Sequence, residues 1–362
     1  MVELKEIASH FALENEISEI EPLGTGLIND TYRIKTIAQE APDYVLQRIN
    51  HNVFKDVALM QNNILRITEH IRHKLQERSE NDLERKTLTI IPAKDGKLYY
   101  FDGENYWRVT IFIKDSKTYE QVTPEFARLT GIAFGEFQYF LSDLPGEPLG
   151  ATIPDFHNMS FRIQQLKEAI QTNAANRLDK VQAIVDELLA REEEMCLAEK
   201  LYKEGKLPKR TAHCDTKVNN MLFDKDDHFL CVIDLDTTMP GFVLSDFGDF
   251  IRTAGNTGAE DDEDLSRVSV NMDIFKEFAC GYIQSAKAFL TPLEISLLPF
   301  SGQMMTYMQT VRFLTDYING DTYYKIKNPE HNYQRTLAQL TLLHSIDAHL
   351  QEMNQWIESL TK

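Results

Sequence analysis

A short polar segment in the middle of the chain carries the residue types that phosphoryl transfer needs. Residues 213–220 read HCDTKVNN, which fits the pattern H-x-D-x-x-x-x-N, and Asp234 follows at the end of an apolar run. Transfer to a hydroxyl needs a carboxylate that accepts the hydroxyl proton, and an amide oxygen and a second carboxylate that hold magnesium on the nucleotide phosphates. Asp215, Asn220 and Asp234 supply these groups in the order of a kinase catalytic loop.

Two more side chains of this segment have expected roles. Lys217 stands two residues after Asp215, from where its ammonium group could reach the transferred phosphoryl group and stabilise its charge in the transition state. His213 is expected to organise the loop by packing and hydrogen bonding, because the reaction needs only one proton acceptor. The alternative is that His213, Asp215 and Asn220 only cap a turn, as short polar residues often do. The order of loop, hairpin and terminal aspartate favours the catalytic interpretation.

A glycine-containing turn near the N-terminus is a candidate phosphate-binding loop. Gly24, Thr25 and Gly26 stand between two expected strands, and glycines let the backbone approach phosphate oxygens closely. A dinucleotide-binding fingerprint would need a third glycine and a helix directly afterwards, but the strand-like run TYRIK follows instead. A plain hairpin turn remains the alternative. In the next expected strand, YVLQRI, Arg48 is the only basic candidate for contacting the α and β phosphates, and Glu69 is its candidate partner.

A second acidic motif resembles a metal-binding tripeptide but stands in the wrong place. Asp246, Phe247 and Gly248 spell the magnesium motif of protein kinases at the expected start of a helix, so Asp234 is the preferred ligand. Asp246 is expected either to cap that helix or to act as a buried acceptor that steadies the His213 loop, with Asp249 as a helper.

The elements before residue 114 have mostly β-type periodicity. Apolar residues alternate with polar ones in six runs, and glycines in Asp95-Gly96 and Asp102-Gly103 suit tight turns between two pairs of them. One amphipathic helix is expected from Val53 to Leu75. The six expected strands are Ile20–Leu23, Thr31–Lys35, Tyr44–Ile49, Thr87–Ile91, Leu98–Phe101 and Tyr106–Ile113.

The rest of the chain is mainly helical in pattern. Exceptions are two short apolar runs, Asn220–Phe223 and His228–Asp234, separated by an Asp226-Asp227 turn. The sequence therefore predicts an α+β, two-lobed, protein-kinase-like fold, with a nucleotide-binding lobe at 1–114 and a catalytic and substrate-binding lobe at 115–362. The expected helices are Pro124–Leu141, Ser160–Asn173, Arg177–Leu201, Asp246–Ala254, Met272–Leu290 and a long stretch from Glu294 onward.

Composition limits the classes of partner. The 362 residues are 43% apolar, enough for about two domains, and carry a formal net charge of −18, which disfavours nucleic acid and acidic membranes. The four cysteines have no metal-ligand spacing, and the charged, helix-periodic residues 1–13 do not look like a signal peptide. We expect a cytoplasmic monomer whose partners are small molecules.

These motifs resemble those of the aminoglycoside phosphotransferase and choline kinase superfamily, in which the metal aspartate follows in an I-D dipeptide, here Ile233-Asp234. A closer resemblance is to the N-acetylhexosamine 1-kinases. Segments that carry it occur in order over nearly the whole chain: IASHFAL, GLINDTY, YVLQRIN, WRV, HCDTKVNNML, IDLDTTMPG, DFGDFIR, LLPFSG and RFLTDYINGDTYY through PEHN.

The resemblance implies a reaction and a set of contacts. The γ-phosphoryl group of ATP would pass, with Mg²⁺, to the anomeric hydroxyl of N-acetylglucosamine or N-acetylgalactosamine. Asp215 would be the base, and the sugar would contact Asp215, Thr237, Arg312 and Tyr323. One alternative is a kinase of the same fold for choline, ethanolamine or an aminoglycoside, which would need a carboxylate cluster or an aromatic cage. Asp155, Glu260 and Asp316 are candidates for that cluster. Another alternative is a nucleotide-binding module without catalysis.

Overall fold

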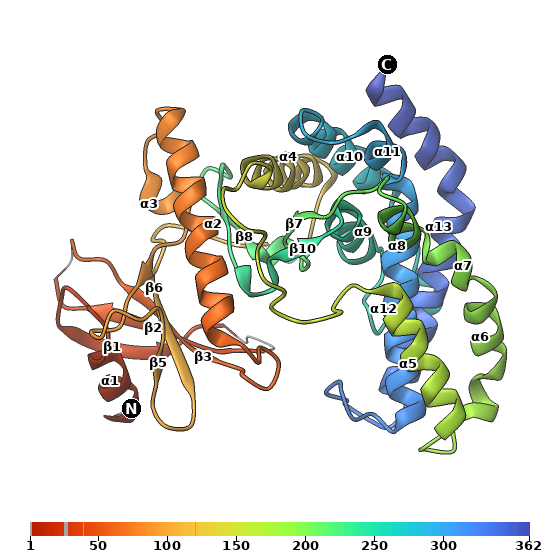
Figure 1. Cartoon of the computed structure of the whole chain (residues 1–362), viewed down its shortest axis with the longest axis horizontal. Helices are drawn as coiled ribbons and strands as arrows, with labels where there is room; N and C mark the ends of the chain where they lie inside the picture. The colour runs from red at the N-terminus through yellow and green to blue at the C-terminus, as the bar shows by residue number, and fades with distance from the viewer. Residues whose placement is uncertain (1, 25–27, 39, 120) are drawn as a thin grey trace. The chain divides into compact units, whose positions relative to one another are not determined.

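A six-stranded antiparallel sheet occupies the N-terminal part of the computed structural model, which describes residues 2–24, 28–38, 40–119 and 121–362 (Figure 1). Its strands follow the order β1-β2-β3-β6-β4, and β5 also pairs with β6. Gly96 and Gly103 have φ angles of 86° and 104°, as the two expected turns require. The strands are β1 (Ile17–Pro22), β2 (Asp30–Thr36), β3 (Tyr44–Ile49), β4 (Ile90–Ile91), β5 (Tyr100–Phe101) and β6 (Tyr106–Ile111).

Helices accompany this sheet. Helix α1 (Val2–Ser9) contributes Ile7 and Ala8 to an apolar core shared with residues of β1, β2, β3 and β6. Helix α2 (Val57–Glu77) buries an apolar stripe, and its first turn is capped by Asp56, whose side chain accepts a hydrogen bond from the Leu59 backbone N–H. A short helix, α3 (Leu83–Lys86), follows. The predicted sheet with one long helix is therefore confirmed.

The chain divides into two compact units. Unit 1 comprises Met1–Thr118, Phe140–Pro154 and Asn219–Pro240, and unit 2 comprises Tyr119–Tyr139, Asp155–Val218 and Gly241–Lys362. Each unit is thus assembled from three segments of chain. The lobe boundary expected near residue 114 stays a prediction.

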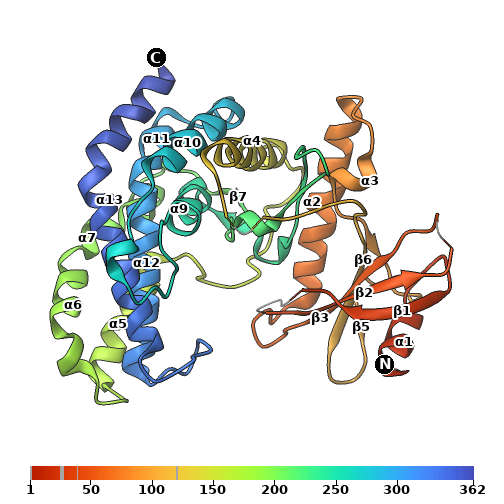
Figure 2. The same cartoon turned by 180° about the vertical axis from the view of Figure 1, so that it is seen from behind.

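The helices that follow the sheet make the rest of the molecule predominantly helical, so the predicted α+β class is confirmed. Helix α12 is buried along most of its length and packs against α5, α9 and α13 (Figures 1 and 2). The helices are α4 (Pro124–Leu141), α5 (Met159–Thr172), α6 (Leu178–Ala190), α7 (Glu192–Met195), α8 (Leu197–Lys203), α9 (Val243–Thr253), α10 (Met272–Ala286), α11 (Pro292–Ser296), α12 (Leu298–Asn319) and α13 (His331–Thr361).

One helix prediction is wrong in its extent. The single helix expected over residues 177–201 is three helices, because the chain leaves α-helical geometry at Arg191 and again at Cys196. At Arg191 the guanidinium forms two hydrogen bonds with Asp347 of α13, 2.7 and 2.9 Å long. A tertiary contact therefore accompanies the first break, which local periodicity could not show.

Short strands and turns carry the motif residues. They are β7 (Arg210–Ala212), β8 (Met221–Phe223), β9 (Phe229–Val232) and β10 (Met239–Gly241), with 3₁₀ turns η1 (Val218–Asn220), η2 (Leu235–Thr237) and η3 (Leu265–Arg267). Among the described residues, no helix combines the length and apolar character needed to cross a membrane.

Candidate active site

The loop after β7 is held by a buried carboxylate of α9. Asp246 accepts hydrogen bonds of 2.8 Å from the backbone N–H groups of both His213 and Cys214, and one of 2.6 Å from the Gln138 amide. Burial raises the pKa of Asp246, although these donors and His213 oppose the shift. Helix α9 begins at Val243, so the capping interpretation of Asp246 is wrong and the buried-acceptor interpretation is confirmed.

Asp249, one turn further along α9, supports the same loop. Its carboxylate accepts from the Thr216 N–H at 3.3 Å and from the Arg252 guanidinium at 2.8 and 3.0 Å. Burial alone would raise the pKa of Asp249, but Arg252 and Lys217 outweigh it and the pKa is lowered. The loop also contains Cys214 at φ 64°, a left-handed conformation that is costly for a residue other than glycine. The bonds to α9 compensate for this strain.

Asp215 and Lys217 lie together at this loop. The Lys217 ammonium is 3.0 Å from a carboxylate oxygen of Asp215, and the two side chains are 41% and 23% exposed. Partial burial would lower the pKa of Lys217, but the carboxylates of Asp215 and Asp249 outweigh it, and the pKa is raised. Lys217 is therefore a cation beside a carboxylate that solvent can reach.

His213 is packed between aromatic rings. Its ring centroid is 5.9 Å from that of Phe134 and 5.8 Å from that of Phe137, both in edge-to-face geometry, and the side chain is buried. Its Nδ1 accepts a hydrogen bond of 3.3 Å from the Asp215 N–H. The expectation that His213 organises the loop agrees with this packing.

Asn220 and Asp234 lie at the same end of the β8–β9 hairpin. Strands β8 and β9 pair antiparallel, and the Ile233 N–H donates to the Asn220 carbonyl at 2.8 Å, so the residue before β8 lies beside the end of β9. Asp234 itself has the left-handed angles φ 57° and ψ 53°. An amide oxygen and a carboxylate are the hard oxygen donors that Mg²⁺ prefers, so the donor set fits this ion.

Only some of the residues expected to contact the nucleotide from the sheet lie among the described residues. Gly24 has φ 71° with open space around the position of a Cβ, whereas Thr25 and Gly26 lie outside the described residues. Arg48 is 46% exposed, and its Nε donates to Asp30 of β2 at 2.7 Å. The structure therefore pairs Arg48 with Asp30 and not with Glu69. Contact of Gly24, Thr25, Gly26 and Arg48 with a nucleotide stays a prediction.

A cavity of about 410 Å³ in unit 2 contains two of the residues named from the family resemblance. Arg312 of α12 and Tyr323 of the following loop both line it, with Arg162 of α5. The loop is fixed by Asp316, whose two oxygens accept from the backbone N–H groups of Thr322, Tyr323 and Tyr324 at 2.8 to 2.9 Å. Tyr323 therefore has a well-defined backbone position and an exposed ring.

Two arginines of this cavity have no carboxylate partner among the residues that the structure describes. Arg162 donates to the Phe156 carbonyl and to Gln165, and Arg312 donates to Gln309 and lies over the Phe156 and Tyr324 rings. Burial and the neighbouring Arg312 lower the pKa of Arg162 to about 10. The cavity wall also contains carboxylates, but Asp316 is occupied by amide donors and Glu168 is exposed and accepts from Gln164.

His157 lies in unit 2, in the segment before α5. Its Nδ1 is enclosed without a hydrogen-bond partner. Burial lowers the pKa of His157 to about 3, with Arg312 and Arg162 adding to the effect and Asp249 opposing it. The ring of His157 is therefore neutral at neutral pH.

A family comparison decides the class of protein. A family model described as the Phosphotransferase enzyme family matches residues 19–273, which is more than half of the chain. The chain belongs to this family. It is therefore a phosphotransferase, and the H-x-D-x-x-x-x-N loop and the Asn220–Asp234 hairpin both lie within the matched residues.

Solved structures share the fold of this phosphotransferase at low sequence identity. An aminoglycoside phosphotransferase from Alicyclobacillus acidocaldarius has a TM-score of 0.61 and 13% identity, covering 98% of this chain and 96% of its own. Spectinomycin phosphotransferase, solved with ADP and spectinomycin, has a TM-score of 0.58 and 12% identity, covering 97% and 98%. Choline kinase from Cryptosporidium parvum has a TM-score of 0.56 and 13% identity, covering 99% and 96%. These likenesses confirm the kinase-like fold.

Sequence reasoning about this phosphotransferase missed a buried ion pair in unit 1. Arg108 of β6 and Asp236 of η2 form two hydrogen bonds, and both side chains are almost completely buried. Two signals could have indicated it. Arg108 is a charged residue inside the apolar strand YWRVTI, and Asp236 stands two residues after Asp234. Buried charges in such positions usually have a charged partner.

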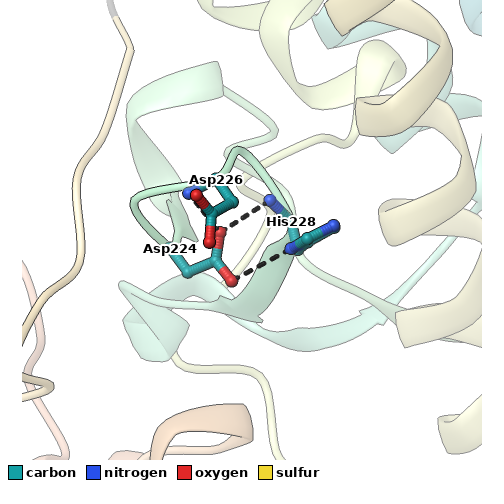
Figure 3. Close-up of side chains that lie close together, drawn as sticks. All are labelled: Asp224, Asp226 and His228. Carbon is teal, nitrogen blue, oxygen red and sulfur yellow. Dashed lines mark hydrogen bonds and ion pairs between the residues drawn. The ribbon is translucent and has the colours of Figure 1, made fainter.

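A third group of polar side chains lies at the tip of the β8–β9 hairpin (Figure 3). Ligand atoms of Asp224, Asp226 and His228 lie within 4.8 Å of one another. Asp224 accepts from the backbone N–H groups of Asp226 and His228 at 2.8 and 2.9 Å and hydrogen bonds with the His228 ring at 3.1 Å. These bonds close the turn, so the phosphotransferase needs no ion at this position to account for the cluster.

Proposed function

We propose that this phosphotransferase transfers the γ-phosphoryl group of ATP to the anomeric hydroxyl of N-acetylglucosamine or N-acetylgalactosamine, which gives the sugar 1-phosphate and ADP. The observation that carries the choice of acceptor is the cavity with Arg162, Arg312 and Tyr323. Its guanidinium groups offer N–H donors to the hydroxyl and acetamide oxygens of a neutral sugar, and the tyrosine ring offers an apolar face with a polar tip.

The same cavity disfavours a cationic acceptor. Arg162 and Arg312 would repel choline, ethanolamine or an aminoglycoside, since neither forms an ion pair with a carboxylate in the described chain. The three candidate carboxylates already have hydrogen-bond or ion-pair partners, although Asp316 lines the same cavity. Asp155 accepts from Asn158 at 2.7 Å, Glu260 pairs with Arg252 at 2.6 Å, and Asp316 holds the loop beside Tyr323. The fold is shared with choline kinase, so the distinction rests on these side chains.

In the proposed reaction Asp215 accepts the proton of the anomeric hydroxyl as its oxygen forms the new bond to phosphorus. The bond between the γ-phosphorus and the β–γ bridging oxygen breaks, and ADP leaves with the electron pair of that bond. Lys217 compensates the charge that spreads over the phosphoryl oxygens. Asn220 and Asp234 would hold Mg²⁺, which neutralises phosphate charge when bound. Thr237, Arg312 and Tyr323 would orient the sugar.

Phosphorus NMR of the purified protein tests this function. MgATP is incubated separately with N-acetylglucosamine, N-acetylgalactosamine, glucose, galactose and choline. We expect a sugar 1-phosphate signal with the N-acetyl sugars that is absent with Asp215→Asn. A phosphocholine or sugar 6-phosphate signal would contradict the proposed acceptor and point to another small-molecule kinase. Unchanged ATP with every acceptor would favour a nucleotide-binding module.

A further inference from the structure

Arg108 projects from β6 to a residue that follows the metal-ligand candidate Asp234. Its Nη1 and Nη2 donate to the two carboxylate oxygens of Asp236, the second at 3.0 Å. The side chains are 6% and 2% exposed. Such a two-point contact between planar groups fixes orientation as well as distance. The ion pair therefore fastens the η2 turn to the central part of the sheet.

A third donor completes the environment of Asp236. The Asn29 side-chain amide donates to its Oδ2 at 2.7 Å, and the side-chain oxygen Oδ1 of Asn29 accepts from the Asn50 backbone N–H at 2.9 Å. Asn29 lies at the end of the segment that begins with Gly24. The Asp236 carboxylate thus connects the turn after Asp234 with Asn29, which follows the candidate phosphate-binding loop in sequence, and through Asn29 with Asn50 directly after β3.

Strand β3 adds the fourth member of this network. Gln47 is the register partner of Arg108, accepts from its Nε at 2.8 Å and donates to Thr31 at 3.0 Å. Its neighbour Arg48, the basic residue of this strand, pairs with Asp30 instead. In unit 1, the guanidinium group that contacts Gln47 of β3 therefore belongs to Arg108 of β6.

Stability alone does not explain the buried ion pair of Arg108 and Asp236. Replacing a buried ion pair with apolar residues of similar volume often leaves stability unchanged or raises it, because desolvation of two charges is costly. Asp234, meanwhile, has a left-handed backbone, a conformation that aspartate tolerates better than most residues, so its backbone angles alone do not explain the ion pair. A two-point contact two residues away restricts both the position and the direction of the turn that carries Asp234, which a non-directional apolar contact does less.

We infer that Arg108 is a positioning residue, which through Asp236 holds Asp234 in the orientation that binds magnesium on the nucleotide. This inference rests on the proposed function, because it takes Asp234 as the metal ligand. Asp236 itself is not assigned to the metal, since its oxygens are occupied by Arg108 and Asn29.

The test measures the affinity of a non-hydrolysable ATP analogue by calorimetry, with and without Mg²⁺. The ratio of the dissociation constant without Mg²⁺ to the dissociation constant with Mg²⁺ reports how strongly the metal contributes to nucleotide affinity. Residues that orient a metal ligand typically change metal affinity by about 10- to 100-fold, so we expect Arg108→Met and Asp236→Asn each to reduce this ratio by about tenfold or more. Affinity without the metal should change little.

A double replacement separates positioning from stability. In Arg108→Met/Asp236→Leu both charges are absent, so the melting temperature should recover toward that of the original protein while the magnesium-dependent gain in affinity stays low. Recovery of both would show that the pair is only structural and would overturn the inference. If this variant does not fold, Arg108→Gln/Asp236→Asn serves instead, since it keeps side chains that can hydrogen bond and removes both charges.

A matched control uses another arginine of the same sheet. Arg33 of β2 pairs with Asp43 at 2.6 Å and lies over the Phe112 ring at 4.2 Å. Arg33→Met should lower the melting temperature without changing the magnesium ratio; an equal loss of the ratio would contradict the inference. If the original protein shows no magnesium-dependent gain, the metal assignment in the proposed function fails as well. If it shows the gain and the variants keep it, only the inference about Arg108 fails.

Discussion

The carboxylate of Asp215 lies beside the Lys217 ammonium, 3.0 Å away. This contact keeps a positive charge next to the proposed base and next to the place where phosphoryl charge would develop. The backbone N–H of Asp215 is bonded to the buried ring of His213, so the base is attached to a rigid support. At the scale of single residues, the proposed chemistry therefore depends on two neighbouring side chains with different proposed roles.

Lys217→Met should lower kcat by about 10²-fold, the loss typical of removing one group that stabilises transition-state charge. KM for the acceptor should change much less, because the ammonium acts on the phosphoryl group. Steady-state kinetics with N-acetylglucosamine measures both. Lys200→Met is the control, since Lys200 is an exposed residue of α8 whose nearest carboxylate partner is Glu193 at 3.7 Å. A kcat for Lys217→Met equal to that of the control would refute the role.

Arg162 should determine discrimination by charge at the acceptor. N-acetylglucosamine is neutral, whereas glucosamine carries an ammonium group at neutral pH that Arg162 and Arg312 would repel. Arg162→Met should raise kcat/KM for glucosamine relative to N-acetylglucosamine by about tenfold. Arg162→Lys, which keeps the charge, should retain the preference. Arg128→Met changes an exposed arginine paired with Glu277 and should leave the ratio unaltered. The hypothesis fails if all three variants show the same ratio.

At the scale of elements, helix α9 both supports the loop that contains Asp215 and packs against α12. Its Asp246 and Asp249 accept hydrogen bonds from the loop that contains Asp215, and Gly248 lets the helix approach α12. A Cβ on Gly248 would lie 2.1 Å from the Ser301 carbonyl oxygen, a distance that backbone atoms cannot relieve by a small adjustment. The tripeptide DFG here is therefore a packing and support motif.

Gly248→Ala should destabilise the protein by about 1 to 3 kcal/mol or more, the range for overpacking a core. The reason is that α9 and α12 must separate, and we expect catalytic activity to fall with stability because α9 supports the loop. Thermal unfolding measures the change. In Gly302→Ala the new Cβ would meet the Ile251 side chain at 3.3 Å, which can adjust, so this variant of the same interface should be milder. Equal melting temperatures for both variants would contradict the packing argument.

At the scale of the whole molecule, a large excess of negative charge coexists with many ion pairs. The net charge is −18, and carboxylates that are paired in the folded state make stability depend on pH. Asp261 is an instance in unit 2. It lies 2.7 Å from the Lys327 ammonium and 2.8 Å from the His331 ring, and these hydrogen bonds lower its pKa to about 2.

Because the pKa of Asp261 is lower in the folded state, its contribution is present above about pH 4 and is lost as the pH falls toward 2. With allowance for solvent screening, the contribution is about 1 kcal/mol. Asp261→Asn should therefore lower the melting temperature by about 2 to 4 °C at pH 7, and by clearly less near pH 3. Calorimetric scans at both pH values check this. A loss that is as large at pH 3 as at pH 7 would mean that the carboxylate charge is not responsible.

Local features of the chain were predictable because they depend on neighbours in sequence. Alternating apolar residues indicated the strands of the sheet, and the β8–β9 hairpin followed from two apolar runs around Asp226-Asp227. The spacing of Asp215, Asn220 and Asp234 identified the phosphotransferase motif, since a catalytic loop and a hairpin constrain those distances along the chain. Their contacts with metal and substrate stay predictions.

Tertiary structure decided which distant residues meet. Arg108 and Asp236 are 128 positions apart, and Asn29 and Asp236 are 207 apart, so no periodicity or spacing could pair them. The same applies to the choice between capping and loop support for Asp246, and to the meeting of Arg162 with Arg312 in one cavity. The sequence by itself determined most of the elements and the order of the candidate catalytic groups, because backbone preferences are local. Only packing determined which buried charges became partners, because a buried charge is stabilised by groups that the fold brings near it.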